Sequence, residues 1–427
     1  MSNHWNRREY ANGVAPEDRP PRASWTINGR FLTQNVTGVQ RYGREIVRAL
    51  DALVSEQHPL TEGLNLELLV PEASEPIDLA AIPVRRTGRL VGHAWEQWTL
   101  AREARGGILS LCNTSTPLRS KQVVCIHDAT MIDCPASFSR AFRLLYRTLL
   151  PVLGRRAALV TTVSEYSRTR LAKHRIAAPG KVRVVPNGHE HALGWRIDPS
   201  ASALPVDRNT ILVIGSPAPH KNVGLLLRMA NDLAVHGIKV AVVGSLDRKV
   251  FAGAGLESDG PVNWLGRLSD GEMAAALARC LCLAFPSLAE GFGLPPLEAM
   301  ARGCPVVVSN RASVPEVCGD GALYAAPDDP QSWLTAFLAL RGNPALRERL
   351  VEKGFGRASR YSWYRSAEMY LEAMAGVDAA ARAPRFGSEM RTRVSGAGPI
   401  VSPQERRVLP LEPSRASRRA SLRPWDG

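Results

Sequence analysis

The sequence predicts an α/β protein of two doubly wound domains, and three observations lead to this fold class. Short apolar runs rich in β-branched residues alternate with amphipathic helical stretches, as in a parallel sheet that helices cover on both faces. This alternation occurs twice, before and after a polar stretch at residues 198–209. The chain has 427 residues, which is about the length of two ordinary domains. We therefore expect two such domains that face each other across a cleft.

The first series of elements defines a predicted domain over residues 25–195. Strands are expected at residues 25–27, 66–70, 122–126 and 159–163, and helices at residues 38–54, 138–153 and 165–173. Ser164 is expected to cap the last of these helices, where the helix dipole favours an acidic side chain at Glu165. Pro151 is expected to kink or end the preceding helix, because Pro lacks the backbone N–H group that an internal turn requires.

The second series defines a predicted domain over residues 196–355. Strands are expected at residues 210–214, 239–243, 281–285 and 305–309, and helices at residues 222–236, 270–279 and 295–302, with a further short helix after residue 309. Each strand is short, apolar and closed by Gly, Ser or Pro, which is typical of buried parallel strands. In such sheets ligands bind beyond the carboxyl ends of the strands. The loops that follow the strands are therefore where we expect the chemistry.

The two ends of the chain differ in composition from the rest. Residues 1–24 are rich in Pro, Asn and charge without an apolar period, and residues 379–427 combine Arg, Ser, Pro and Gly with few aromatics. Such segments hold too few apolar side chains to form a core, so we expect both to be disordered. The tail contains ten Arg and four acidic residues and thus contributes much of the net charge of +14.

The rest of the chain is only mildly basic. This charge fits a protein that handles phosphorylated ligands or contacts anionic lipid, and a solvated basic surface is the alternative. No motif of a nucleic-acid-binding module occurs, so we expect no nucleic-acid partner. The start, MSNHWNRREY, lacks the apolar stretch of a signal peptide, and no apolar run is long enough to span a bilayer. We expect a cytoplasmic protein.

The cysteines and acidic residues do not form the patterns of a metal site. The seven Cys residues include no CxxC pair, and several lie in apolar runs such as residues 280–285. This favours buried free thiols in a reducing compartment. No Asp-x-Asp lines the expected cleft, and no His or Cys cluster has metal-ligand spacing. We therefore expect neither a divalent metal nor another cofactor.

The most informative segment is FPSLAEGFGLPPLEAMA at residues 285–301. Its Pro pair suits the first turn of a helix, whose free backbone N–H groups bind anions, and its Gly residues allow a ligand to approach closely. Glu290 lies in the loop and Glu298 in the first turns of the helix, so both carboxylates can border one pocket. There they would accept hydrogen bonds from the hydroxyl pairs of a sugar ring or a ribose. Two solvated acids near a helix start are the alternative.

With E-x7-E in this segment, followed by GCPVV, SVPEV and GDGALY, the chain resembles the retaining glycosyltransferases of family 4, which have the GT-B architecture. Further segments similar to that family follow in its usual order. They lie at residues 37–50, 126–135, 161–174, 184–191, 211–230 and 263–277. The resemblance covers about residues 25–375. A last helix near residues 361–374 looks like the family's return to the first domain, which gives a crossover segment at residues 356–378.

The resemblance implies three catalytic residues, His127, Lys221 and Glu290. Glu290 would hold hydroxyls of the donor sugar, while Glu298 would hold the ribose hydroxyls of the nucleotide. Lys221 follows the first strand of the second series, where a mobile cation can neutralise a leaving diphosphate. His127 follows a strand of the first series and would contact the donor sugar near the reacting centre. A surface Lys and a structural His are the alternatives.

Backbone groups complete the implied donor site. The amides of Gly291, Phe292 and Gly293 would contact the sugar and the diphosphate, and Gly38 would let the backbone approach the diphosphate or the acceptor. The full predicted donor-binding set is Gly38, Gly215, Ser216, His220, Lys221, Gly266, Leu268, Glu290, Gly291, Phe292, Gly293, Leu294 and Glu298. Many relatives place an Arg soon after the Gly that ends the first strand of this domain. Here Ser216 follows that Gly, so His220 is our candidate for the second phosphate contact.

We therefore expect a hexosyltransferase, with GDP-mannose as the first donor candidate and UDP-linked and dTDP-linked sugars next. The expected acceptor is a saccharide or a lipid-linked saccharide of lipopolysaccharide or exopolysaccharide assembly. Residues 138–156 combine Phe and Leu with Arg, so this helix can lie on an anionic bilayer and attach the protein peripherally. A core-facing stripe with a solvated basic face is the alternative. The competing functions are a sugar-nucleotide epimerase of the same architecture and a nucleic-acid-binding protein.

Overall fold

The computed structural model describes residues 23–244 and 260–382. The predictions of disorder therefore fall mainly outside the described residues. Where they overlap these residues they are wrong, because strand β1 begins at Ala23 and helix α16 extends to Arg382. Asp378 near the end of α16 accepts a hydrogen bond from Trp25 Nε1 of β1 at 2.8 Å, which ties both ends of the described chain to the first sheet.

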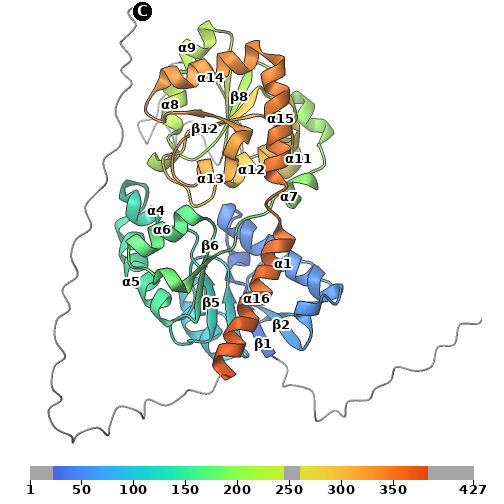
Figure 1. Cartoon of the computed structure of the whole chain (residues 1–427), viewed down its shortest axis with the longest axis vertical. Coiled ribbons are helices and arrows are strands. Elements are labelled where there is room, and N and C mark those ends of the chain that lie inside the picture. The colour runs from blue at the N-terminus through green and yellow to red at the C-terminus, as the bar shows by residue number, and fades with distance from the viewer. Residues whose placement is uncertain (1–22, 245–259, 383–427) are drawn as a thin grey trace, which may run out of the picture. The chain divides into compact units, whose positions relative to one another are not determined.

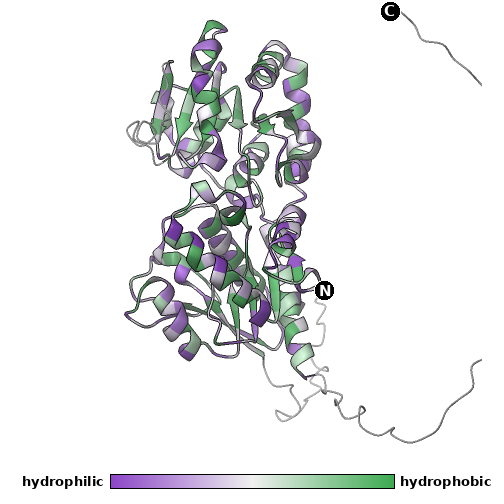
Figure 2. Cartoon of the chain, turned by 90° about the vertical axis from the view of Figure 1, so that its left-hand side faces the viewer, coloured by the Kyte–Doolittle hydropathy of each residue, from purple (hydrophilic) through white to green (hydrophobic). Residues whose placement is uncertain are grey.

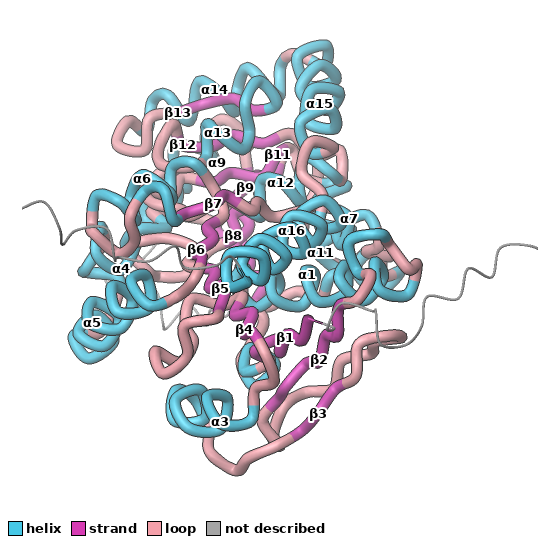
Figure 3. The backbone as a smooth tube through the Cα atoms, turned by 60° about the horizontal axis from the view of Figure 1, so that its bottom comes forward, coloured by secondary structure: helices cyan, strands magenta, loops and turns pink. Residues whose placement is uncertain are grey.

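Within the described residues, the first sheet has seven parallel strands in the order β3-β2-β1-β4-β5-β6-β7 (Figure 3). They are β1 (Ala23–Asn28), β2 (Leu64–Val70), β3 (Val84–Arg86), β4 (Gly107–Ser110), β5 (Gln122–Cys125), β6 (Leu159–Thr162) and β7 (Val182–Val184). The strand order changes direction between β1 and β4. This is the topological switch point of the sheet, where doubly wound folds bind ligands.

In the described part of the chain, the second sheet has six parallel strands in the order β10-β9-β8-β11-β12-β13. They are β8 (Thr210–Ile214), β9 (Lys239–Val243), β10 (Val262–Gly266), β11 (Cys282–Phe285), β12 (Val306–Ser309) and β13 (Ala322–Ala325). The switch point of this sheet lies between β8 and β11. The expected fold class, two doubly wound α/β domains, is thus confirmed.

Helices connect the strands and cover the sheets (Figure 1). The longer ones are α1 (Gly38–Ser55), α5 (Arg140–Arg156), α6 (Glu165–Lys173), α11 (Asp270–Arg279), α12 (Leu294–Ala301), α14 (Pro330–Gly342), α15 (Pro344–Ala358) and α16 (Trp363–Arg382). Shorter ones are α4 (Thr130–Asp133), α7 (Glu190–Leu193), α8 (Val223–Arg228), α9 (Ala230–Val235) and α13 (Val314–Cys318). Residues 92–103 form a helical segment whose middle part, η4 (Trp95–Leu100), is a π-helix.

Two predicted helices differ from the structure. Helix α5 passes Pro151 and continues to Arg156 instead of ending, because Leu150 and Leu153 in its last turns are buried and packing holds them in place. The helix predicted over residues 222–236 is interrupted at Met229 and forms α8 and α9.

The strands carry the apolar core, and in Figure 2 they show mainly the hydrophobic colour. Helix α16 lies along α1 beside the first sheet (Figure 1). Tyr370 of α16 is fully buried, and its hydroxyl lies 2.8 Å from the Tyr42 hydroxyl of α1 and 2.9 Å from Thr161 Oγ1 of β6. The last helix therefore belongs to the packing of the first sheet, although the second sheet precedes it in the chain.

Candidate active site

Lys221 and Glu290 meet at the switch point of the second sheet. Lys221 ends the short 3-10 helix η8 (Pro219–Lys221) after β8, and Glu290 lies in the loop after β11. Lys221 Nζ donates a hydrogen bond to Glu290 Oε1 at 2.7 Å, and the two side chains are 28% and 13% exposed. The structure thus brings together the cation and the carboxylate that the sequence assigned to the diphosphate and to the donor sugar.

The loops that carry this pair are fastened to each other. Asn222 adopts a left-handed backbone conformation at φ 52°, and its Nδ2 donates to the carbonyl oxygens of Pro286 at 3.2 Å and Pro327 at 2.8 Å. The N–H group of Leu288 donates to the carbonyl of His220 at 2.7 Å. The position of Lys221 beside the loop after β11 is therefore set by backbone and amide contacts, while its long side chain keeps rotational freedom.

The glycine loop leads directly into α12. Gly293 is the N-cap residue at φ 104°, a conformation that a residue with a side chain rarely adopts. Ser313 Oγ donates to the carbonyl oxygens of Glu290 at 3.0 Å and Phe292 at 2.9 Å, which holds the loop in shape. Within the described residues, the backbone N–H groups of Gly291, Phe292 and Gly293 make no hydrogen bond. They are available to an anion at the positive end of the helix.

Glu298 is held by a histidine from α7. His191 Nε2 lies 2.8 Å from Glu298 Oε1, and Trp363 Nε1 donates to His191 Nδ1 at 2.9 Å. An indole N–H only donates, so Nδ1 carries a lone pair and Nε2 carries the proton. His191 therefore donates from Nε2 to Glu298 and orients the carboxylate. Sequence reasoning missed this role, because the contact joins segments more than a hundred positions apart.

A cation from helix α1, Arg41, lies beside the carboxylate of Glu298. Arg41 of α1 has its Nε 3.9 Å from Glu298 Oε1, and its guanidinium donates to Asp270 of α11 at 2.8 and 3.2 Å. Burial lowers the pKa of Arg41, but the hydrogen bond to Asp270 and the charge of Glu298 raise that pKa above its ordinary value. Arg41 stays charged, so the predicted ribose contact carries a positive neighbour that the sequence did not reveal.

Gly291 packs against the end of β5. A Cβ atom at this position would lie 2.9 Å from Asp128 Oδ2 and 3.1 Å from the carbonyl oxygen of His127. The Gly291 carbonyl accepts hydrogen bonds from Ser164 Oγ at 2.6 Å and from Ser167 Oγ at 3.0 Å. A side chain at residue 291 would push these groups apart, which gives this Gly a structural reason besides the predicted contact with the donor.

Ser164 caps α6, as predicted, because its Oγ also accepts from the N–H group of Ser167 at 3.0 Å. The same helix end binds a carboxylate of the second domain. Glu316 of α13 accepts from the N–H groups of Glu165 at 2.8 Å and Tyr166 at 3.0 Å, where the helix dipole favours negative charge. We call the contacts of Ser164, Ser167, Gly291 and Glu316 the α6 clasp. It fastens the glycine loop and α13 to the first domain.

His127 is packed into the first domain. Its side chain is 5% exposed, its Nε2 donates to the Leu111 carbonyl at 2.8 Å, and its ring meets Tyr42 edge-on at 4.8 Å. Burial lowers the pKa of His127, but the Cys125 thiol and the Leu111 carbonyl raise it above its ordinary value. This burial fits the alternative of a structural His, and the contact with a donor sugar stays a prediction.

Three predicted glycines differ in the free space around their Cα atoms. A Cβ atom at Gly38, the first residue of α1, would meet nothing within 4 Å, and the same holds for Gly266 at the end of β10. At Gly215, in contrast, a Cβ atom would lie 2.3 Å from Val223 Cγ2. Packing against α8 therefore explains Gly215, while Gly38 and Gly266 have room for a ligand.

The remaining predicted side chains differ in access. Phe292 and Leu294 are 5% and 6% exposed, so only their backbones can face a ligand, and Leu268 packs partly against the core. Ser216 Oγ accepts from the Ala218 N–H group at 3.4 Å. His220 stacks on Phe138 at 5.8 Å, and burial together with the charge of Lys221 lowers its pKa. A neutral His220 is a hydrogen-bond partner rather than a second cation.

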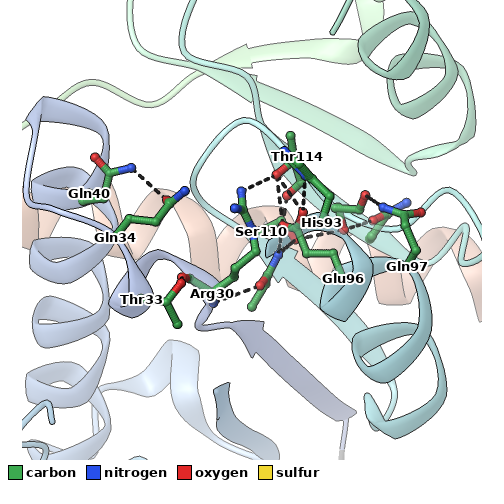
Figure 4. A network of polar contacts seen from close by, with 12 residues as sticks. Arg30, Thr33, Gln34, Gln40, His93, Glu96, Gln97, Ser110 and Thr114 are labelled. Atoms are coloured by element: carbon green, nitrogen blue, oxygen red, sulfur yellow. Dashed lines mark hydrogen bonds and ion pairs between the residues drawn. The ribbon is translucent and has the colours of Figure 1, made fainter. Parts of the chain in front are cut away.

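A second group of charged side chains, which the sequence did not indicate, lies at the switch point of the first sheet (Figure 4). Arg30 follows β1, and Glu96 lies in the π-helix η4. Arg30 Nε lies 3.0 Å from Glu96 Oε1 as an ion pair, with the side chains 6% and 1% exposed. Asn28 at the end of β1 and Thr114 after β4 each bond the same carboxylate, at 2.9 Å for the shortest contacts.

Two surface hollows lie away from these groups. Two surface hollows, of about 470 and 380 Å³, lie against α15 and beside the start of β1, and none of the predicted site residues lines either of them. In residues 23–244 and 260–382, no three His, Cys, Asp or Glu side chains gather as a group that could hold a metal ion.

Comparisons with known proteins address the family and the fold. Residues 196–357 match the family model described as Glycosyl transferases group 1. The chain is 29% identical over 328 residues to the O-antigen chain mannosyltransferase RfbU of Salmonella typhimurium, covering 73% of this chain and 89% of that protein. It is 28% identical over 364 residues to the O-antigen chain mannosyltransferase B of Escherichia coli, covering 77% and 93%.

The fold is similar to that of solved glycosyltransferases. The sucrose-phosphate synthase of Thermosynechococcus elongatus superposes with a TM-score of 0.62 at 16% identity, over 84% of this chain and 100% of the other. At this identity the likeness concerns the fold alone, and it agrees with the two parallel sheets described above. The chain has the GT-B architecture, and the match to the Glycosyl transferases group 1 model falls on its second sheet with the surrounding helices.

Proposed function

We propose that this chain transfers a mannosyl group from GDP-mannose, with retention of configuration, to a saccharide or lipid-linked saccharide in surface polysaccharide assembly. The observation that carries the proposal is the pairing of Lys221 with Glu290 at the switch point of the matched domain. Two relatives that the chain spans almost completely are named O-antigen chain mannosyltransferases, which supports mannose as the sugar. The matched family leaves the epimerase and nucleic-acid alternatives without support.

The proposed chemistry follows from the charges at this site. Departure of GDP from the anomeric carbon builds negative charge on the diphosphate, and a positioned cation lowers the barrier for that step. Lys221 would exchange its bond to Glu290 for the diphosphate, with the free amides before α12 as further donors. Glu290 would then accept hydrogen bonds from hydroxyls of the mannose. Glu298, oriented by His191, would accept them from the ribose.

Binding of a panel of nucleotide sugars tests this function. Thermal unfolding and calorimetric titration with GDP-mannose, UDP-glucose, UDP-galactose and dTDP-rhamnose should give the largest stabilisation and the tightest binding for GDP-mannose. A larger effect of a UDP-linked or dTDP-linked sugar would correct the donor. If none of these compounds bound, the transferase proposal itself would be wrong.

We also propose that the transfer needs no divalent metal, since Lys221, Arg41 and the start of α12 supply positive charge near both ends of the donor. Protein that has been dialysed against EDTA should transfer mannose at the rate of untreated protein. Loss of activity that returns with Mg²⁺ or Mn²⁺ would contradict this proposal.

We further propose a cytoplasmic protein that attaches to the inner face of the membrane through α5. None of the helices within the described residues is long and apolar enough to cross a membrane. Along α5, Phe142, Leu144 and Leu145 are 37%, 69% and 41% exposed, and Arg140 and Arg147 are exposed as well. Exposed apolar groups flanked by Arg fit insertion into the surface of an anionic bilayer.

Flotation with vesicles of phosphatidylglycerol and phosphatidylethanolamine tests this attachment. The Leu144→Asp, Leu145→Asp variant should lose most of the binding that the full chain shows. Val235→Asp is the matched control, because Val235 of α9 is 84% exposed but lacks the flanking Arg residues. Equal flotation of both variants would remove α5 from consideration and leave the basic tail as the membrane contact.

A further inference from the structure

Arg41 and Asp270 form an ion pair that joins the two domains. Nη1 and Nη2 of Arg41, on α1, donate to the carboxylate of Asp270, on α11, at 3.2 and 2.8 Å. The pair is partly open to solvent, because the two side chains are 22% and 50% exposed. Ion pairs in contact with solvent contribute little to stability, since water competes for both partners. Asp270 is therefore a partner that another anion can replace.

The guanidinium of Arg41 has donors beyond those that Asp270 uses. Asp270 accepts from the two terminal nitrogens. Nε makes no hydrogen bond within the described residues, and its distance of 3.9 Å to Glu298 Oε1 is too long for one. The guanidinium also lies over the Trp195 ring, 5.6 Å from its centroid, a contact that favours a cation. Arg41 can thus bind a further acceptor beside Glu298.

The order of the groups along the donor indicates which part of it Arg41 can meet. Under the proposed function Glu290 binds the mannose and Glu298 binds the ribose, and the diphosphate of GDP-mannose joins these two parts. Lys221 pairs with Glu290 and therefore lies at the mannose end of the diphosphate. Arg41 lies at the ribose end, where a single CH₂ group separates the ribose ring from the first phosphate.

The start of α1 leaves room for a nucleotide near Arg41. Gly38 precedes Arg41 by about one helical turn, so both residues lie on the same side of α1. A Cβ atom at Gly38 would meet nothing within 4 Å. His220, beside Lys221, is less suited to a phosphate, because burial and the charge of Lys221 lower its pKa. The side of α1 that carries Arg41 is therefore open to a ligand, and its cation complements Lys221.

We propose that Arg41 exchanges Asp270 for the phosphate next to the ribose, so that each domain supplies a cation to the diphosphate. The proposal rests on the proposed function, in which GDP-mannose is the donor. A guanidinium binds phosphate oxygens through paired N–H groups, and these charge-assisted hydrogen bonds are among the strong ones. The half-exposed carboxylate of Asp270 holds Arg41 in place until the nucleotide arrives.

The two cations should act on different kinetic constants. When the bond to mannose breaks, negative charge builds on the phosphate next to the mannose, whereas the phosphate next to the ribose keeps its charge. An interaction that is equally strong before and during this step affects binding rather than rate. Arg41→Ala should therefore raise the KM for GDP-mannose and change kcat little, while Lys221→Ala should mainly lower kcat.

Calorimetric titration of the full chain with GMP and GDP tests the proposal, because GMP carries only the phosphate next to the ribose. Arg41→Ala should raise the Kd of both nucleotides about tenfold, the size expected for a lost hydrogen bond to a charged group. Arg41→Lys, which keeps the charge, should recover part of the loss. Lys221→Ala should raise the Kd of GDP but not that of GMP. Asp270→Asn, which frees Arg41, should bind both nucleotides at least as tightly as the unaltered chain.

Arg85→Ala is the matched control. Arg85 of β3 also donates twice to a carboxylate, with Nε and Nη2 at 3.1 and 3.0 Å from Glu67, and its side chain is similarly exposed at 27%. It lies in the strand at the edge of the first sheet and should leave both Kd values unchanged.

Two results would overturn the proposal. One is an unchanged Kd for both nucleotides in folded Arg41→Ala. The other is an equal loss of affinity in Arg41→Ala and Asp270→Asn, which would make the ion pair a brace between the domains and nothing more. If the unaltered chain bound neither GMP nor GDP, the proposed function itself would be wrong.

Discussion

The switch points of the two sheets hold different kinds of charge pair. Arg30 and Glu96 in the first sheet are 6% and 1% exposed, and further side chains bond to the carboxylate. Lys221 and Glu290 in the second sheet are 28% and 13% exposed and bond chiefly to each other. The first pair is almost closed to solvent, whereas the second pair is partly open to it.

We therefore interpret the first pair as a group that orients neighbouring side chains, and the second pair as a group that can bind a ligand. In the first sheet the buried carboxylate of Glu96 fixes the orientation of the partly exposed His93 ring. In the second sheet the long side chain of Lys221 is partly exposed, so under the proposed function it would meet the charge of a leaving diphosphate. The first arrangement suits a structural support, and the second suits the proposed contact with an anionic leaving group.

The largest expected effect is a loss of activity in variants of Lys221 and Glu290. Lys221→Ala should lower kcat for mannose transfer about a thousandfold, since removing one group that stabilises developing charge has effects of this order. Glu290→Gln should also lower kcat, because it keeps the shape of the side chain but removes the charge that faces Lys221. Both variants should keep the melting temperature within a few degrees, as the pair lies near the surface.

Lys239→Ala is the control for this prediction, because Lys239 forms a similar pair with Asp207 at 2.6 Å in the same domain, away from the switch point. Its kcat should equal that of the unaltered chain. A comparable loss of activity in Lys221→Ala and Lys239→Ala would show that the switch point has no special role.

The buried pair of Arg30 and Glu96 should affect the stability of the fold rather than the rate of transfer. Glu96→Gln leaves Arg30 buried without its counter-charge and should lower the free energy of unfolding by about 3 kcal/mol. The control is Glu103→Gln, because Glu103 is 37% exposed beside Arg85 and should change stability little. Chemical denaturation of the three proteins measures both differences. A Glu96→Gln protein as stable as the unaltered chain would contradict the closed character of this pair.

The loss of stability caused by Glu96→Gln should depend on pH. Burial raises the pKa of Glu96, but His93 and Arg30 hold that pKa below its ordinary value of 4.5. A lowered pKa in the folded state means that the stabilisation is fully present above pH 4.5 and is lost as pH falls through the lowered value. The difference in unfolding free energy between the unaltered chain and Glu96→Gln should therefore shrink below pH 4.5. A difference that grew on acidification would contradict this assignment.

The smallest effect concerns the α6 clasp. Ser164→Ala and Ser139→Ala each remove a helix cap, of α6 and α5 respectively, and each should lower stability by about 1 kcal/mol. Ser164 also bonds the Gly291 carbonyl, whereas Ser139 makes no hydrogen bond to the second domain within the described residues. Only Ser164→Ala should therefore raise the KM for GDP-mannose. Equal donor KM values in the two variants would mean that the clasp does not shape the glycine loop.

Local signals were sufficient for much of the fold. The helices α6 and α11 and the strands β8 and β9 agree with their predicted bounds, because a capping Ser or an apolar run closed by Gly marks their ends. Five strands were missed, namely β3, β4, β7, β10 and β13, since runs of three to five residues carry little or no period. The passage of α5 through Pro151 depends on tertiary packing, which local sequence does not record.

The candidate site was predictable only where a motif marks it. Glu290, Glu298 and Lys221 follow strands or start a helix, so their placement could be expected. The partners that hold them could not, because His191 reaches Glu298 through a fold that brings distant segments together. Arg30 and Glu96 gave no signal either, since a buried ion pair looks like ordinary surface charge in the sequence.

The most direct test is a crystal structure of the full chain with GDP-mannose, or with GDP if the sugar is hydrolysed. The diphosphate should lie within hydrogen-bonding distance of Lys221 Nζ and of the amides before α12, with the ribose at Glu298. A diphosphate bound beside Arg30 and His93, at the switch point of the first sheet, would contradict the division of roles between the two sheets.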